Sequence, residues 1–533
     1  MKAAILASVS LLVMVVGVLT ADPPASGSDL DRDLAGHWAK VDQPIEVSPM
    51  NAPELGKGAF SLAMWVKVDD RMDRPTGDLL SRYDPRSRRG FHLTLKSSPG
   101  VTSNQPNDRH LQFGIDAYRN SEWRDCGRPG QAVVAFSMAV HQGSLYVGTC
   151  EPEKGSSGRV YRYAGGKNWI DCGAPDGSNA VTAMAVYDGR LHVGTGKYRL
   201  AGSSLKESEN PTRGGKVFRH EGGTRWTECG QLPGTEAIGG LLVFRGQLHA
   251  SSLYAPAGFF RYEGNQKWTS LPVPMATDAT GKQLPRRVVA LTMHEGHLYA
   301  GSYDGGHVYR YEGENWIDCG QLGDNTQTYS FAQYQGRLHV GTWPSGRVYR
   351  FDGIRKWADV GQLGEEREVM GMIVHNGRLI AGTLPMGEVY SYEGERYWKK
   401  LARLDWTPDV KYRRVWTMAE HEGQLFVSTL PSGKIHAFSA GQQASWGHSL
   451  SAGWHHVTAI KTAQRLKLFV DGKLVSETLP FDAASYHLDT NQPLHLGTGS
   501  NGPLNGSLSD VRIYRRALEL PEIEALLKKA PGK

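Results

Sequence analysis

Three arginines, Arg286, Arg367 and Arg413, each lie ten residues before a hairpin glycine in a repeated sequence pattern. A guanidinium group presents a planar fork of N–H donors that matches a carboxylate or sulfate group. If equivalent positions of the repeat face one centre, the three side chains converge there. We therefore predict an anion-binding mouth suited to acidic polysaccharide. The alternative is solvated arginines paired with nearby carboxylates such as Glu365 and Glu366.

Tyr303, Asp304 and Trp343 extend this predicted ligand-binding set, because they lie in loops expected on the same face as the arginines. A glycosidase would need two carboxylates flanking the bond to be cleaved. Glu151, Asp304 and Glu368 are available near these loops, and we interpret them as ordinary surface acids. Catalytic residues are therefore left unassigned. A third hypothesis is a platform that binds another extracellular protein.

The elements that would position these residues follow from a repeat marked by seven tryptophans spaced 41 to 57 residues apart: Trp123, Trp169, Trp226, Trp268, Trp316, Trp357 and Trp398. A period of this size, with short strands separated by turns, is typical of β-propeller blades. Seven sets of three strands can be counted. The last set lacks a fourth strand after Phe438, whereas Trp123 begins a fourth strand with no blade before it. We therefore predict a seven-bladed propeller over residues 121–440, closed by its N-terminal strand.

Four of the five cysteines share one repeat position, within the pattern W-x-x-C-G: Cys126, Cys172, Cys229 and Cys319. Equivalent positions of neighbouring blades should lie beyond the roughly 7 Å between Cα atoms that a disulfide allows. We predict that these cysteines are buried small hydrophobes. Cys150 has no evident partner. One hairpin, residues 221–226, resembles part of the aspartate box of sialidases, but Arg219 stands where that box has Ser or Thr.

The repeat is flanked by two segments, residues 37–120 and 446–527, that alternate in hydrophobicity like strands. The stretches F-S-L-A-M-W-V, G-W-H-H-V-T and L-F-V-D-G-K-L-V resemble the laminin G-like, concanavalin A-like jelly roll. The resemblance implies an all-β chain, a jelly-roll sandwich with the seven-bladed propeller inserted. It also implies a glycan or protein ligand. Calcium is implied only by this resemblance, since no loop offers a dense carboxylate cluster, and no other cofactor or metal is predicted.

Residues 1–21 read as a secretory signal, with Lys2, an apolar run and small residues before Asp22. A membrane anchor is the alternative, although the run is short for a bilayer. No later segment is apolar enough to span a membrane. We therefore expect a secreted, periplasmic or cell-surface protein. The net charge of +6 comes from 60 basic and 54 acidic residues without long basic runs, which argues against nucleic-acid binding.

Overall fold

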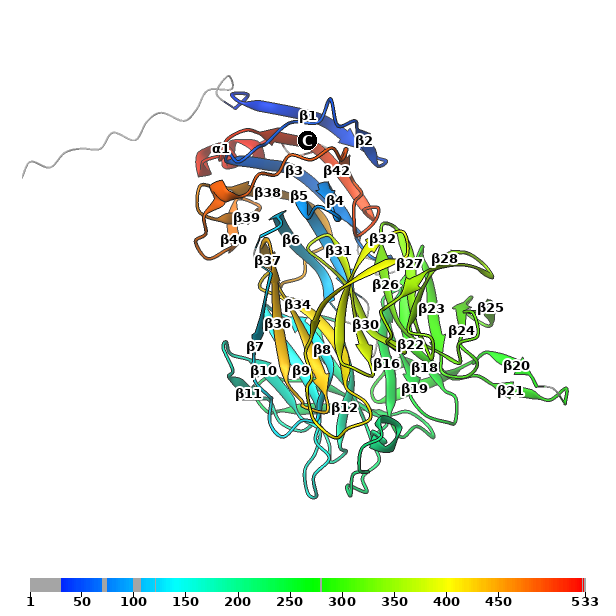
Figure 1. Ribbon diagram of the computed structural model, residues 1–533. Helices are drawn as coiled ribbons and strands as arrows, with labels where there is room; N and C mark the ends of the chain where they lie inside the picture. The colour runs from blue at the N-terminus through cyan, green and yellow to red at the C-terminus, as the bar shows by residue number, and fades with distance from the viewer. Residues whose placement is uncertain are drawn as a thin grey trace, which may run out of the picture.

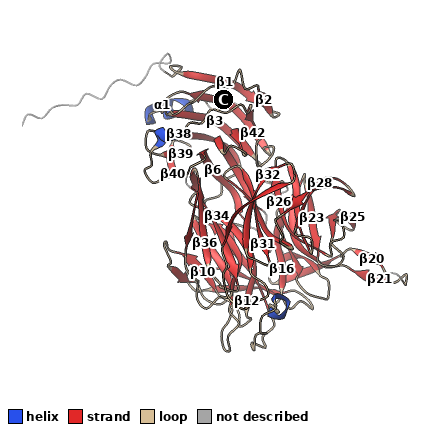
Figure 2. Ribbon diagram, in the orientation of Figure 1, coloured by secondary structure: helices blue, strands red, loops and turns tan. Residues whose placement is uncertain are grey.

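The computed structural model describes residues 30–69, 74–98, 107–119, 121–278, 280–529 and 531. A ring of small sheets lies below a two-sheet sandwich, and almost all regular structure is β-strand (Figures 1 and 2). The sequence explains this class, since its strands are short and rich in Val, Tyr and Leu and are separated by Gly-containing turns. The predicted signal, residues 1–21, lies outside the described residues.

Seven four-stranded antiparallel blades form the ring, and the first two are joined into one eight-stranded sheet where Ala180 of β12 pairs with Cys150 of β9. The first strands of neighbouring blades contact one another around the centre of the ring. Blade one consists of β8 (Val134–His141), β9 (Ser144–Cys150), β10 (Val160–Tyr163) and β11 (Trp169–Asp171). Blade two consists of β12 (Ala180–Tyr187), β13 (Arg190–Gly196), β14 (Lys216–His220) and β15 (Trp226–Gln231). Blade three consists of β16 (Ile238–Phe244), β17 (Gln247–Ser252), β18 (Phe259–Gly264) and β19 (Lys267–Leu271). A small hairpin, β20 (Met275–Thr277) and β21 (Gln283–Pro285), projects from the ring before blade four (Figure 1).

The remaining four blades follow the same plan. Blade four consists of β22 (Val288–His294), β23 (His297–Ser302), β24 (His307–Tyr311) and β25 (Trp316–Gln321), and blade five of β26 (Gln327–Tyr334), β27 (Arg337–Trp343), β28 (Arg347–Gly353) and β29 (Lys356–Gln362). Blade six consists of β30 (Glu368–His375), β31 (Arg378–Leu384), β32 (Glu388–Gly394) and β33 (Tyr397–Arg403). Blade seven consists of β34 (Arg414–His421), β35 (Gln424–Leu430), β36 (Ile435–Ala440) and the N-terminal strand β7 (Ser121–Asp125).

The prediction that the N-terminal strand closes the ring is confirmed. Strand β7 pairs with β36, and Trp123 lies opposite Phe438 with its ring centroid 4.7 Å away. The repeated tryptophans join neighbouring blades. Four of them donate their indole N–H to the backbone carbonyl oxygen of the cysteine in the preceding blade, over 2.8 to 2.9 Å: Trp169, Trp226, Trp268 and Trp357. All five cysteines are buried and free.

The sandwich interleaves both ends of the chain, as expected of one host fold split by an insertion. One sheet has the order β1 (Leu34–Val41), β42 (Gly506–Tyr514), β3 (Phe60–Val68), β38 (Gly453–Lys461), β39 (Leu466–Val470) and β40 (Lys473–Glu477). The other has the order β2 (Ile45–Val47), β41 (Leu494–Leu496), β4 (Asp78–Asp84), β5 (Arg89–Ser98), β6 (Asn107–Ala117) and β37 (Gln442–Trp446). The short helices are η1 (Leu200–Ser203), η2 (Ala483–Ser485) and α1 (Leu520–Leu527).

A two-stranded ribbon connects the sandwich to the ring. Strand β6 pairs with β37 in the sandwich, and their continuations β7 and β36 pair in the last blade. The sandwich lies over the turns that join the first and second strands of the blades. There Gly143 donates its N–H to Gly447 and Gln335 donates to Ser500, over 2.9 and 2.7 Å. The long loops therefore surround the opposite, open mouth of the ring (Figure 1). The domain limits given above stay predictions.

Candidate functional site at the open mouth

A buried ion pair lies where two neighbouring innermost strands begin. Strand β30 starts with Glu368 and β34 starts with Arg414, and Arg414 Nε lies 3.2 Å from Glu368 Oε1. Their side chains are only 2% and 8% exposed. Because innermost strands of adjacent blades run side by side along the channel, residues at the same strand end meet there. The pair therefore marks the base of the open mouth.

The long loop after β13 covers this pair. Its short helix η1 ends at Ser203, whose Oγ accepts a hydrogen bond of 2.6 Å from Arg414 Nη1. Tyr198 is 2.5 Å from the same hydroxyl, and its own OH lies 3.5 Å from Arg414. Glu207 accepts the N–H groups of the first two residues of η1 over 3.2 Å, which fixes the helix across the channel. Figure 2 shows this helix at the foot of the ring.

Aromatic side chains from successive blades surround the ion pair. Tyr254, Tyr303 and Tyr329 are partly buried and pack on the central apolar cluster, which includes Trp416. The rings of Tyr303 and Tyr329 are 4.8 Å apart. The guanidinium group of Arg199 lies 4.4 Å from the Tyr254 ring. Aromatic side chains around a few convergent polar groups are typical of the lining of ligand sites.

The electrostatics of the mouth are perturbed mainly by burial. Burial raises the pKa of Glu368, although Arg414 and a hydrogen bond from Tyr329 oppose the shift. Burial also raises the pKa of Tyr198, and the pKa of Tyr329 is raised by burial and then by the Glu368 charge. Titratable groups perturbed together in a cleft are typical of functional sites. Among the described residues, no group of three or more His, Cys, Asp or Glu is placed to hold a metal ion.

The six residues predicted from the sequence make several separate local contacts. Arg367 is exposed and stacks over Trp343, with its guanidinium carbon 5.1 Å from the ring centroid. Asp304 forms a two-point ion pair with Arg287, the residue after Arg286, at 2.6 Å for the shortest contact. Those contacts occupy the carboxylate.

The remaining predicted arginines make local contacts. Arg413 donates to the carbonyl oxygens of Thr407 and Val410 over 2.7 and 3.2 Å, so its side chain is held by its own loop. The backbone N–H of Arg286 bonds to Pro274 over 2.8 Å. No hydrogen bond or ion pair between described residues joins any two of the three predicted arginines through a shared acceptor.

The interpretation of the acidic residues was partly wrong. Glu368 and Glu151 are buried rather than on the surface, and Glu151 accepts hydrogen bonds from Thr149 and Tyr161 over 3.0 and 3.1 Å. Glu368 and Arg414 each follow one of the predicted arginines by a single residue. Because side chains alternate along a strand, that shift moves the residue to the other face. Strands β30 and β34 are buried at every position, so the alternation of hydrophobic residues along them does not mark the channel-facing residue.

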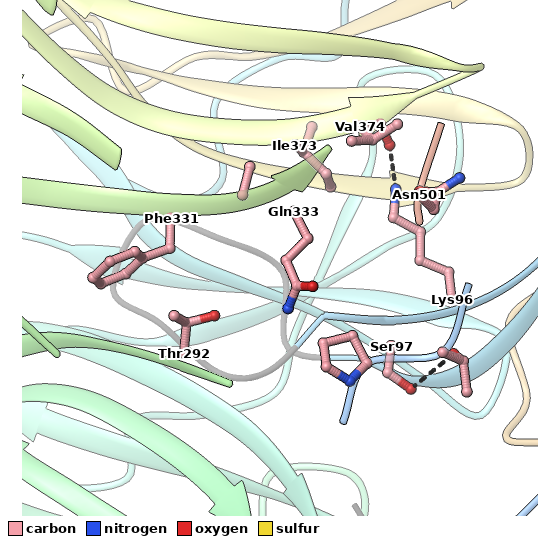
Figure 3. A pocket seen from close by; sticks show the side chains of 11 residues that line it. Lys96, Ser97, Thr292, Phe331, Gln333, Ile373, Val374 and Asn501 are labelled. Carbon is pink, nitrogen blue, oxygen red and sulfur yellow. Dashed lines mark hydrogen bonds between the residues drawn. The ribbon is translucent and has the colours of Figure 1, made fainter. Parts of the chain in front are cut away.

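The other end of the channel is closed by the sandwich. Lys96 of β5 reaches into the ring, where its Nζ donates to Val374 O and lies 2.5 Å from Glu420 Oε2 (Figure 3). Glu420 also contacts His375 Nδ1 over 2.8 Å. A cavity of about 40 Å³ remains beside Lys96 and Gln333, which is space for no more than a water or two. A second cavity at this end, of about 220 Å³, is lined by residues of the sandwich and the ring, among them His110 and Gln142.

Comparisons with known proteins agree with the sandwich. Residues 410–524 match the Laminin_G_3 family, the concanavalin A-like lectin/glucanases superfamily. No curated protein matches the chain. Among solved structures, a catalytically inactive virginiamycin B lyase from Staphylococcus aureus with quinupristin is 10% identical, with a TM-score of 0.46 over 60% of this chain and 99% of that one. Sqt1 from Saccharomyces cerevisiae is 13% identical, with a TM-score of 0.38 over 61% and 100%.

Proposed function

We propose that the open mouth of the propeller binds carbohydrate, with a preference for acidic polysaccharide. The concanavalin A-like match is consistent with binding of carbohydrate or protein. The observation that carries the proposal is the wall of tyrosines around the Glu368–Arg414 pair. Flat aromatic faces can cover the apolar faces of sugar rings, while the buried charges supply directional hydrogen bonds.

The preference for acidic chains rests on two exposed arginine–aromatic pairs at the rim. Arg367 stacks on Trp343, and Arg403 lies 4.0 Å from the ring centroid of Trp406, which is 69% exposed. Neither guanidinium group has an ion pair with a carboxylate among the described residues. Both guanidinium groups can therefore bind a sulfate or uronate group without breaking an ion pair.

A binding series tests the proposal. The full chain should bind a sulfated or uronic polysaccharide more tightly than a neutral one, and added salt should weaken that preference. Arg367→Ala combined with Arg403→Ala should weaken acidic binding by at least about tenfold. Arg350→Ala is the matched control, because Arg350 is paired with Asp352. Equal affinity for neutral and acidic chains would overturn the acidic preference, and no glycan binding at all would favour a protein partner.

A glycosidase is less well supported by the geometry. Around Arg414, the one carboxylate in contact among the described residues is that of Glu368, whereas hydrolysis needs two. Release of reducing ends from a polysaccharide panel would contradict a purely binding role. We further propose that the chain is secreted, as residues 1–21 predict. In the described part of the chain, no helix is long and apolar enough to cross a membrane.

A further inference from the structure

A serine, a histidine and an aspartate form a linear hydrogen-bonded chain on the sandwich. Ser451 Oγ lies 2.9 Å from His455 Nε2, and His455 Nδ1 lies 2.8 Å from Asp471 Oδ2. Ser451 precedes strand β38, His455 lies within β38, and Asp471 lies in the turn between β39 and β40. Figure 1 places these strands in the sandwich, away from the open mouth.

The order of contacts sets the protonation of the imidazole. A carboxylate can only accept a hydrogen bond, so His455 donates its Nδ1–H to Asp471 and keeps Nε2 free to accept the serine proton. Asp471 is itself held in place. Its Oδ1 accepts the backbone N–H of His456 over 2.9 Å, and its own N–H donates to His456 O over 2.8 Å. The base is thus oriented by a rigid third group.

The serine is open to solvent, as a nucleophile that receives substrate must be. Ser451 and Ala452 are exposed, whereas the His455 side chain is only 15% exposed. The backbone N–H groups of Ser451 and Ala452 donate to no acceptor within the described ranges of the chain. They are available to stabilise negative charge on a carbonyl oxygen that Ser451 attacks.

We propose that Ser451, His455 and Asp471 hydrolyse small O-acyl esters, independently of glycan binding at the propeller. Ser451 Oγ attacks the ester carbonyl while its proton passes to His455 Nε2. The C–O bond to the alcohol then breaks, and His455 returns the proton to that leaving oxygen. Water then gives a proton to His455 Nε2 and attacks the acyl-serine carbonyl. The bond between the acyl carbon and Ser451 Oγ breaks, and His455 returns the proton to Oγ, which releases the acid and restores Ser451. A small acyl group fits an exposed serine, and an ester has a better leaving group than an amide.

Turnover of p-nitrophenyl acetate by the full chain tests the proposal. Ser451→Ala and His455→Gln should each lower kcat/KM by at least about 100-fold. Mass spectrometry should find the acetyl group on Ser451. The matched control is His487→Gln, because His487 lies 3.8 Å from Asp489 without a serine contact. This variant should retain full turnover, and thermal melts should show that all variants fold.

Asp471 acts through His455 as a positioning residue. Asp471→Asn should lower kcat and leave KM unchanged, and Asp471→Glu should recover part of the loss. The proposal is overturned if the wild-type chain shows no turnover above buffer, if Ser451→Ala turns over the ester as fast as wild type, or if acetyl is found only on lysines. Glycan binding by the same variants should be unchanged, so this result does not depend on the propeller's ligand.

Discussion

The two mouths of the propeller channel hold buried ion pairs built on the same two strands, and the pairs differ in how fully the carboxylate is compensated. Strands β30 and β34 begin at the open mouth with Glu368 and Arg414, and at the closed mouth they carry His375, the last residue of β30, and Glu420, the residue before the last of β34. At the open mouth, burial raises the pKa of Glu368 despite Arg414. At the closed mouth, burial also opposes ionisation, but Lys96 and His375 lower the pKa of Glu420 to about 2.

This difference in carboxylate pKa distinguishes the two ends of the channel. A carboxylate with two cationic or hydrogen-bonding partners strongly favours its charged form, so the closed mouth is a fixed attachment between the sandwich and the ring. A carboxylate with a raised pKa is incompletely compensated and gains from an added donor. That difference supports the proposal that a ligand binds at the open mouth.

Acid should destabilise the closed mouth. Burial lowers the pKa of His92 to about 4 and that of His110 to about 3. The unfolded chain binds these protons below about pH 6.5, so stability is full above that pH and is lost as the pH falls toward 4. The expected loss is roughly 3 kcal/mol per histidine at pH 4. Urea unfolding at pH 7 and pH 4 measures it, and His92→Gln/His110→Gln should show a shallower dependence. An equal dependence would contradict the assignment.

Glu420→Gln should lower the free energy of unfolding by about 3–5 kcal/mol, because Lys96 would remain buried without its charged partner. Urea unfolding at pH 7 checks this value. Glu395→Gln is the control, since its partner Arg86 is 61% exposed; it should lower the free energy of unfolding far less than Glu420→Gln does, because solvent screens an exposed pair. Similar losses in both variants would mean that the closed mouth is not a fixed attachment.

Glu368→Gln should lower the free energy of unfolding by less than Glu420→Gln does, because the pKa of Glu368 is raised and that of Glu420 is lowered, so the neutral form is better tolerated at Glu368. Burial of Arg414 without a charged partner opposes this tolerance, so the comparison with Glu420→Gln is the informative measurement. A loss as large as that of Glu420→Gln would show that both mouths are structural attachments.

Tyr329→Phe should have the smallest effect, below about 1 kcal/mol of unfolding free energy. Tyr329 lowers the pKa of Glu368 while its hydroxyl donates to Gln327 Oε1, so removal of the hydroxyl should raise the pKa of Glu368 further. Carboxyl-detected NMR titration of Glu368 can measure the shift. An unchanged pKa would show that the tyrosine does not contact the carboxylate in solution.

Much of the fold could be predicted from the sequence, because period-locked residues report local geometry. The strand at Trp123 and the gap after Phe438 were sufficient to predict how the ring closes. The site was harder to predict. Arg367 and Arg413 lie at the predicted end of the ring, but the side chains that face the channel belong to the next residues, Glu368 and Arg414. Ion pairing between blades depends on tertiary contacts that no local pattern encodes.

The pairing of β7 with β36, which closes the ring, can form only late in synthesis. Strand β7 leaves the ribosome about 300 residues before its partner β36. At 5–20 residues per second, β7 waits roughly 15–60 s with an unpaired edge. During that interval it is a template for unwanted pairing with other chains. Strand β7 is short and carries charged side chains at Glu122 and Arg124. These charges disfavour pairing of its free edge with a strand of another chain.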